Sequence, residues 1–239
     1  MNDSSSAPAA SPKPAKAKRT PGLLNQEHMR KLDKTDSIVT ATQEENRADA
    51  LAAREITADL VTEVVENIAA ARAKAGEIVQ HRADTRVATE AEAIAAEKLI
   101  GGLQEVQKAA KQKYAKTNRP ALIAYFVGKP LNGSRANLSQ TSQSIVDKAG
   151  ADTLPGYTLA KSKALIALRK TWVAANKQQT DSATAAKTAL ADFKVLLKSI
   201  ETKRAEIQLA ADAEWPHTDE ANAAIRREFR LPANRPHQA

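Results

Sequence analysis

Hydrophobic residues recur every three or four positions along two long stretches of the chain, as they do on one face of an α-helix. Neither stretch, 40–117 or 156–215, contains a proline. The first series is Ile56, Leu60, Val64, Ile68, Ala71, Ala75, Ile78, Val87, Ala91, Ile94, Ala95, Leu99, Leu103, Val106, Ala110 and Tyr114. The second series is Leu165, Leu168, Trp172, Ala175, Ala186, Leu190, Phe193, Leu197, Ile200 and Ile207. The spacing predicts two long helices, each with one apolar face.

Residues 119–156, between the two series, combine prolines and glycines with the most apolar run of the chain, 121–127. Pro120 suits the first turn of a short helix, and Gly128 suits its C-terminal end. A second short helix is expected over about 135–149. This segment is therefore expected to form a small helical head that connects the two long helices.

These elements predict an all-α fold, a long antiparallel helical hairpin or coiled-coil-like bundle with a small helical head and a short C-terminal docking helix. The expected divisions are a disordered basic tail at 1–22, a first long helical arm at 23–118, the head at 119–156, the return helix at 157–214, and a short helix and tail at 215–239. The tail lacks periodic apolar positions, so it cannot bury enough surface to offset the entropy lost on ordering.

The first arm has several candidate starts, namely Asp36 or Ser37 as an N-cap and the capping-box pairs Thr40–Gln43 and Thr42–Glu45. One continuous helix is favoured over a break near His81–Asp84, which would give a more compact four-helix bundle. A straight helix of roughly 75 residues would span about 110 Å. The polar, alanine-rich stretch 176–188 of the return helix is expected to lie opposite 90–97 of the arm.

The composition indicates a thin core. The 239 residues include 49 alanines, whereas aromatic residues make up only 3%. Alanine favours helices and lets them approach closely, but it buries little apolar area. Association of copies through the same apolar faces would add the missing burial, so the chain is expected to form a dimer or a higher oligomer.

The net charge of +8 is unevenly distributed along the chain. Residues 44–66, in the first arm, carry a net charge of −5, whereas the return helix 157–214 carries +4. An acidic helix beside a basic one favours antiparallel pairing of the two. Part of the positive charge is thus explained by contacts within the chain.

Most enzymatic and cofactor chemistry lacks the residues that it needs. The chain has no cysteine, and its four histidines never occur at metal-ligand spacing. Gly101-Gly102 is not followed by the Lys-Ser/Thr of a phosphate-binding loop. We therefore expect no catalytic residues, no metal, no cofactor and no enzymatic activity. No apolar run reaches the ~18 residues that a transmembrane helix needs, and no signal peptide is evident, so a cytoplasmic location is the default.

Two basic clusters make nucleic acid the strongest alternative partner. The tail cluster comprises Lys13, Lys16, Lys18 and Arg19, and the second comprises Lys108, Lys111, Lys113, Lys116 and Arg119. Over about ten residues the tail resembles the Lys/Ala/Pro-rich arms of histone-like proteins, which implies phosphate contacts without sequence reading. For the second cluster, compensation of a helix dipole is the structural alternative.

The apolar head run is a candidate contact surface for a partner or a membrane surface. Its candidate contact residues are Leu122, Ile123, Tyr125 and Phe126. Seven apolar residues are too few to span a bilayer, and a small head needs a core, so burial of this run is favoured over membrane contact. Taken together, the sequence favours a non-enzymatic structural or interaction protein, an elongated scaffold or spacer that self-associates.

Overall fold

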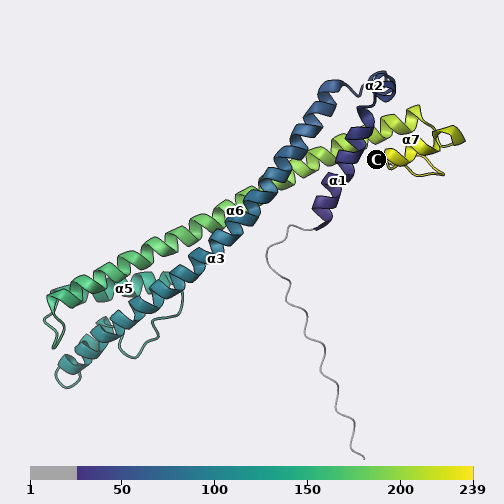
Figure 1. Cartoon of the computed structure of the whole chain (residues 1–239). Helices are drawn as coiled ribbons and strands as arrows, with labels where there is room; N and C mark the ends of the chain where they lie inside the picture. The colour runs from purple at the N-terminus through teal and green to yellow at the C-terminus, as the bar shows by residue number, and fades with distance from the viewer. Residues whose placement is uncertain (1–25, 239) are drawn as a thin grey trace, which may run out of the picture.

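The computed structural model of the protein describes residues 26–238. Two long helices, α3 (Ala58–Tyr114) and α6 (Leu159–Glu214), run beside each other in opposite directions over the length of the molecule (Figure 1). The expected all-α antiparallel hairpin is therefore confirmed. The basic tail 1–22, with Lys13, Lys16, Lys18 and Arg19, lies outside the described residues.

Shorter helices thicken the two ends of this hairpin (Figure 1). At one end, α4 (Ala121–Ala124) and α5 (Arg135–Ala151) form the predicted head. At the other end lie α1 (Gln26–Thr42), α2 (Glu45–Ala52), a 3₁₀ turn (Glu220–Asn222) and α7 (Ala223–Glu228). Between the ends, α3 and α6 form a two-helix waist. No helix of the described residues is long and apolar enough to span a membrane.

The first arm differs from the expectation, because residues 26–52 form two separate helices that fold back toward α6. Glu55 has a left-handed backbone (φ 68°), and the Thr57 side chain accepts a hydrogen bond from the amide of Leu60 as the N-cap of α3. The candidate starts from Asp36 to Thr42 lie inside α1 instead. The 57 residues of α3 span about 86 Å, so the long arm is shorter than expected.

α3 is continuous through His81–Asp84, so the favoured single helix is correct there. Its buried seam alternates steps of four and three residues, which add to the seven-residue repeat of a coiled coil. In steps of seven residues, the seam runs from Ile78 to Thr85, Glu92 and Leu99. Val87 and Ile94, expected on the apolar face, are off this register and stay 67% and 49% exposed.

The waist separates two apolar cores, one at each end. Residues of α6 around Asp181 and Thr184 lie beside Glu77 and His81 of α3, lining one shallow groove. The expected pairing of 176–188 with 90–97 is thus wrong by about three helical turns, since the buried ends set the register rather than the alanine content. Here the polar part of each helix faces the polar part of the other.

Gly102 lies where side chains of α6 pack tightly against α3 in the head core. A Cβ added at Gly102 would lie 2.9 Å from Cδ1 of Leu165 and 3.3 Å from Cδ1 of Leu168. Gly101 has nothing within 4 Å of such an atom. One of the two adjacent glycines is therefore needed for helix packing, whereas the other is not.

Candidate functional site

A buried cluster of polar side chains fastens the head to α3. The hydroxyl of Tyr125 donates to Oδ2 of Asp152 at 2.6 Å, and the hydroxyl of Tyr114 donates to the same oxygen at 2.9 Å. Nζ of Lys148 lies 3.3 Å from the other carboxylate oxygen. The cluster joins α3, the turn after α4 and the end of α5. Tyr125 is fully buried, so its predicted role in an exposed contact surface is wrong.

The pKa shifts of Tyr125 and Asp152 fit a structural role for this cluster. Burial, with the hydrogen bond to Asp152, raises the pKa of Tyr125 well above its ordinary value of 10.0. The tyrosine hydrogen bonds, that of Tyr125 foremost, lower the pKa of Asp152 below 3.8. A general acid or base works best with a pKa near the operating pH, and both groups are shifted away from neutrality. The cluster stabilises the head and is poorly suited to proton transfer.

Two further contacts hold the head in place. Glu92 is buried on the seam of α3 and accepts two hydrogen bonds from the Arg135 guanidinium, at 2.9 and 2.6 Å. Nε2 of Gln107 donates to the carbonyls of Tyr125 and Phe126 at 3.0 and 2.9 Å. The bonds from Gln107 satisfy two backbone carbonyls of a turn in which Phe126 has a positive φ of 54°.

The apolar run 121–127 is mostly covered. Leu122 and Phe126 are half-buried, as burial of the run predicts, whereas Ile123 is 68% exposed. The predicted contact surface thus reduces to one exposed large apolar side chain on a helix of four residues.

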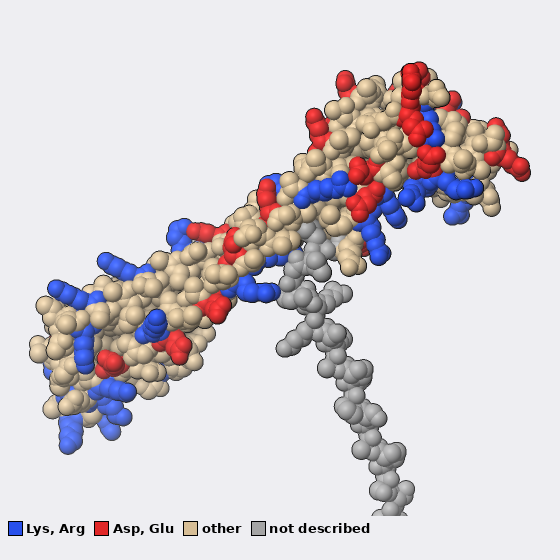
Figure 2. All heavy atoms as spheres, in the orientation of Figure 1, with Lys and Arg blue, Asp and Glu red and all other residues tan. Residues whose placement is uncertain are grey.

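Around the head, residues 98–170, here called the basic end, hold 13 Lys and Arg but only three Asp and Glu. Figure 2 shows their blue side chains projecting from several sides of this end. Nine cations are exposed and have no carboxylate at ion-pair distance among the described residues. They are Lys98, Lys108, Lys111, Lys116, Arg119, Lys129, Lys161, Lys163 and Lys170.

Four members of the predicted cluster 108–119 belong to this surface. The fifth, Lys113, is half-buried and donates to the carbonyl of Thr153 at 2.7 Å. Sequence reasoning missed Lys98, Lys129, Lys161, Lys163 and Lys170. They come from distant parts of the chain and gather only because α3 and α6 pair with the head between them.

A second exposed surface runs along the outer face of α6. It carries large apolar residues that remain partly or largely exposed, namely Leu159 (72%), Ile166 (39%), Val173 (41%), Val195 (70%) and Leu209 (52%). At about 100° per residue, all five lie within about 40° of one another around the helix. We call this row the α6 stripe. It was not predicted, because the apolar series taken from the sequence followed only the face of α6 that packs inside the hairpin.

Exposed threonines continue the stripe where apolar residues are absent. They are Thr180, Thr184, Thr188 and Thr202. The hydroxyls of Thr180, Thr184 and Thr202 donate to carbonyls one turn earlier in α6, so these hydroxyls are already satisfied. This makes the threonine section less polar than its composition suggests.

The stripe is symmetric about Thr184. Leu159 and Leu209 are each 25 residues from it, and Val173 and Val195 are each 11 residues from it. On one flank of the stripe, Lys163, Lys170 and Lys177 stand four positions after Leu159, Ile166 and Val173. In the second half, Asp192, Ser199, Glu206 and Ala213 stand four positions after Thr188, Val195, Thr202 and Leu209. The two halves are thus alike in apolar pattern and opposite in flanking charge.

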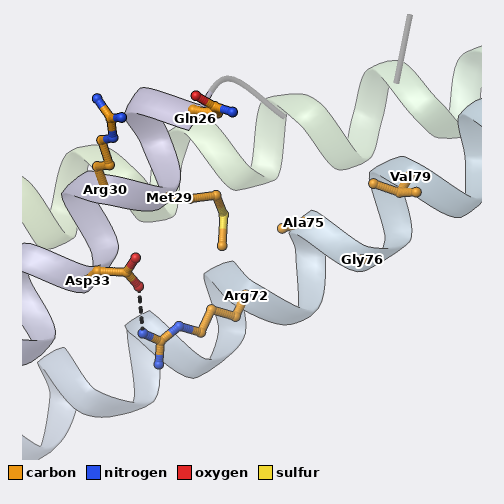
Figure 3. Close-up of a pocket in the computed structure, with 8 residues that line it drawn as sticks. All are labelled: Gln26, Met29, Arg30, Asp33, Arg72, Ala75, Gly76 and Val79. Atoms are coloured by element: carbon orange, nitrogen blue, oxygen red, sulfur yellow. Dashed lines mark hydrogen bonds and ion pairs between the residues drawn. The ribbon is translucent and has the colours of Figure 1, made fainter. Parts of the chain in front are cut away.

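Other surface features offer less chemistry. Figure 3 shows an open groove between α1 and α3, where Met29, Ala75 and Val79 contribute apolar surface. In this groove Arg72 Nη2 already forms an ion pair with Asp33 Oδ1, at 3.1 Å. Within residues 26–238 no group of three or more His, Asp or Glu side chains is placed to hold a metal ion.

Comparisons of the sequence with models of protein families, with curated proteins and with solved structures find no match.

Proposed function

We propose that this protein is a non-enzymatic, elongated helical spacer that self-associates through the α6 stripe, with two copies antiparallel. The observation that carries the proposal is the symmetry of the stripe about Thr184. A two-fold axis at Thr184 brings Leu159 of one copy to Leu209 of the other. It brings Val173 of one copy to Val195 of the other in the same way.

The charged flank supports the same orientation. In an antiparallel pair with two-fold symmetry, each flank of the stripe faces the same flank of the partner. Lys163 then meets Glu206 of the second copy, and Lys177 meets Asp192. In a parallel pair with two-fold symmetry, each flank would face the opposite flank of the partner, so these lysines would not meet these carboxylates.

The spacer role is supported by the architecture. The long helices hold two unlike ends apart, and the buried polar groups of the head act in its stabilisation. The apolar residues of the α6 stripe lie on either side of the threonine section, so a second copy along α6 would add apolar burial on both sides of the thin, alanine-rich waist.

Light scattering coupled to gel filtration tests the association. We expect a dimeric mass for the wild type at micromolar concentration and a monomeric mass for the double variant Val173→Asp/Val195→Asp. The control is Val87→Asp, which adds one such charge at a valine of α3 whose exposure, 67%, is close to the 70% of Val195. A monomeric wild type, or a dimer that survives in the double variant, would contradict the proposal.

Cysteine cross-linking tests the orientation, since the native chain has no cysteine. A Val173→Cys chain is mixed with a Val195→Cys chain under mild oxidation. Antiparallel pairing predicts that the mixed dimer forms fastest, whereas parallel pairing predicts dimers of each variant with itself.

A further inference from the structure

We propose that the basic end binds the sugar–phosphate backbone of double-stranded nucleic acid, without reading its sequence. The surface consists of the nine exposed cations on α3, α6 and the head. Lys163 and Lys170 flank the α6 stripe and lie beside the second copy in the proposed dimer, so the surface rests mainly on the six cations outside α6, namely Lys98, Lys108, Lys111, Lys116, Arg119 and Lys129.

The first argument is charge that the fold leaves unpaired. Residues 98–170 carry a net charge of +10, whereas the remaining described residues, with 19 Lys and Arg against 24 Asp and Glu, carry −5. Neighbouring cations such as Lys108 and Lys111, three residues apart on α3, lie within the Debye length of about 8 Å and repel each other. Binding of a polyanion would relieve this repulsion and release the counterions of its phosphates.

The second argument concerns the residue types. Eight of the nine exposed cations are lysines, with Arg119 as the exception. Lysine acts as a point charge that suits phosphate oxygens, whereas reading a guanine edge favours the planar fork of arginine. The surface is thus suited to backbone contacts, which position a protein on a duplex without sequence information.

The third argument separates duplexes from single strands. Proteins that hold single strands stack bases on exposed aromatic rings. At the basic end Tyr125 is buried, while Tyr114, Phe126 and Tyr157 are half-buried. No aromatic side chain of residues 98–170 is exposed, so the duplex backbone is the better fit.

The distribution of exposed apolar residues argues against a membrane surface. Interfacial binding requires an apolar face that enters the bilayer together with the basic residues. The exposed large apolar residues here are Ile123 on α4 and Leu159 and Ile166 on α6. Ile123 is alone on its element, and the two on α6 are part of the α6 stripe.

Fluorescence anisotropy with a mixed-sequence duplex DNA, titrated at several salt concentrations, tests the proposal in the full chain. The head variant is Lys108→Gln/Lys111→Gln/Lys116→Gln/Arg119→Gln. The matched control, Lys34→Gln/Lys187→Gln/Lys194→Gln/Lys198→Gln, removes the same charge from exposed cations outside the basic end. A tail variant with Lys13, Lys16, Lys18 and Arg19 changed to Gln separates the contribution of the tail.

We expect the head variant to bind at least about tenfold more weakly than the control. The slope of its salt dependence should be shallower by about 0.9 for each phosphate that the variant no longer neutralises. A single-stranded DNA of the same length should bind more weakly than the duplex. Acetylation of lysines, read by mass spectrometry, should show that duplex protects Lys108 and Lys111 more than Lys194.

Three results would overturn the proposal. The head variant and the control could bind the duplex equally well. The tail variant could lose all affinity while the head variant retains it. The wild type could bind phosphatidylserine vesicles but no duplex, which would assign the basic end to membranes instead.

Discussion

The two ends of the molecule use their charges differently. At the end formed by α1, α2 and α7, many charges are neutralised across helices. Arg47 pairs with Glu228 at 2.5 Å, Arg54 with Glu214 at 3.0 Å, and Lys203 with Glu63. At the basic end only Arg135 and Lys148 form ion pairs among the described residues. The first arrangement uses charges to hold helices together, whereas the second leaves most cations exposed and without a carboxylate partner.

Each end also has a polar centre that is at least partly buried, and these two centres differ in what they hold. Arg226 is 2% exposed, donates to the carbonyls of Trp215 and Pro232, and lies 2.6 Å from Asp212. Asp152, by contrast, gathers the hydroxyls of Tyr114 and Tyr125. One centre fixes the C-terminal segment through a charged pair and the other fixes the head mainly through neutral donors.

The largest effect is expected from Arg226→Met. The substitution leaves Asp212 buried without its cation, which typically costs about 3–5 kcal/mol. The free energy of unfolding in urea, followed by circular dichroism, measures this loss. Arg227→Met is the control, because this neighbour is exposed and should change stability by less than about 0.5 kcal/mol. Equal effects of the two variants would show that the buried centre does not stabilise this end.

Tyr125→Phe should have the next largest effect. It removes the shorter of the two tyrosine hydrogen bonds to Asp152 while keeping the buried ring, so a loss of about 1–2 kcal/mol is expected. Hydrogen exchange should show the loss in α5 and the end of α3. Protection near α7 should not change, because the waist separates the two cores.

The same centre predicts a pH dependence. Because the folded pKa of Asp152 is lowered, its contribution to stability is present above the ordinary value of 3.8 and is lost as the pH falls below it. The raised pKa of Tyr125 acts in the opposite range, so that stability falls as the pH rises above 10.0. Denaturation of Asp152→Asn across roughly pH 2–6 should show a shallower acid loss than the wild type. Curves of the same slope would show that Asp152 does not contribute to the acid sensitivity of the head.

The smallest effect is expected when each of the two adjacent glycines of the basic end is replaced by alanine. Gly101→Ala should stabilise the protein by up to about 1 kcal/mol, since helix propensity improves and the new Cβ meets no atom. Gly102→Ala should lose this gain, because its Cβ would push against Leu165 and Leu168. Thermal unfolding of the two variants side by side measures the difference, and equal melting temperatures would disprove the packing role of Gly102.

The agreement between sequence and structure is closest where strong local signals bound a helix. The return helix was expected over 157–214 and α6 covers Leu159–Glu214, between a proline-glycine turn and Trp215-Pro216. The break between α2 and α3 has no such signal, because neither glycine nor proline occurs from 43 to 57. There the chain turns through Glu55 in a left-handed conformation, stabilised by packing of α1 and α2 that local propensity cannot reveal.

The sequence alone determined that the chain is helical, where the return helix runs and where the first long helix ends, because apolar periodicity and helix propensity are local properties. The short head between the two long helices made antiparallel pairing predictable as well. Only the tertiary structure decided which apolar residues remain exposed, since the seven-residue seam excludes Val87 and Ile94 and leaves the α6 stripe uncovered. It likewise decided that Tyr125 is buried and that lysines as far apart in sequence as Lys98 and Lys170 lie at the same end of the molecule. Exposure and charge pairing depend on which elements meet, and that depends on the packing of the whole chain.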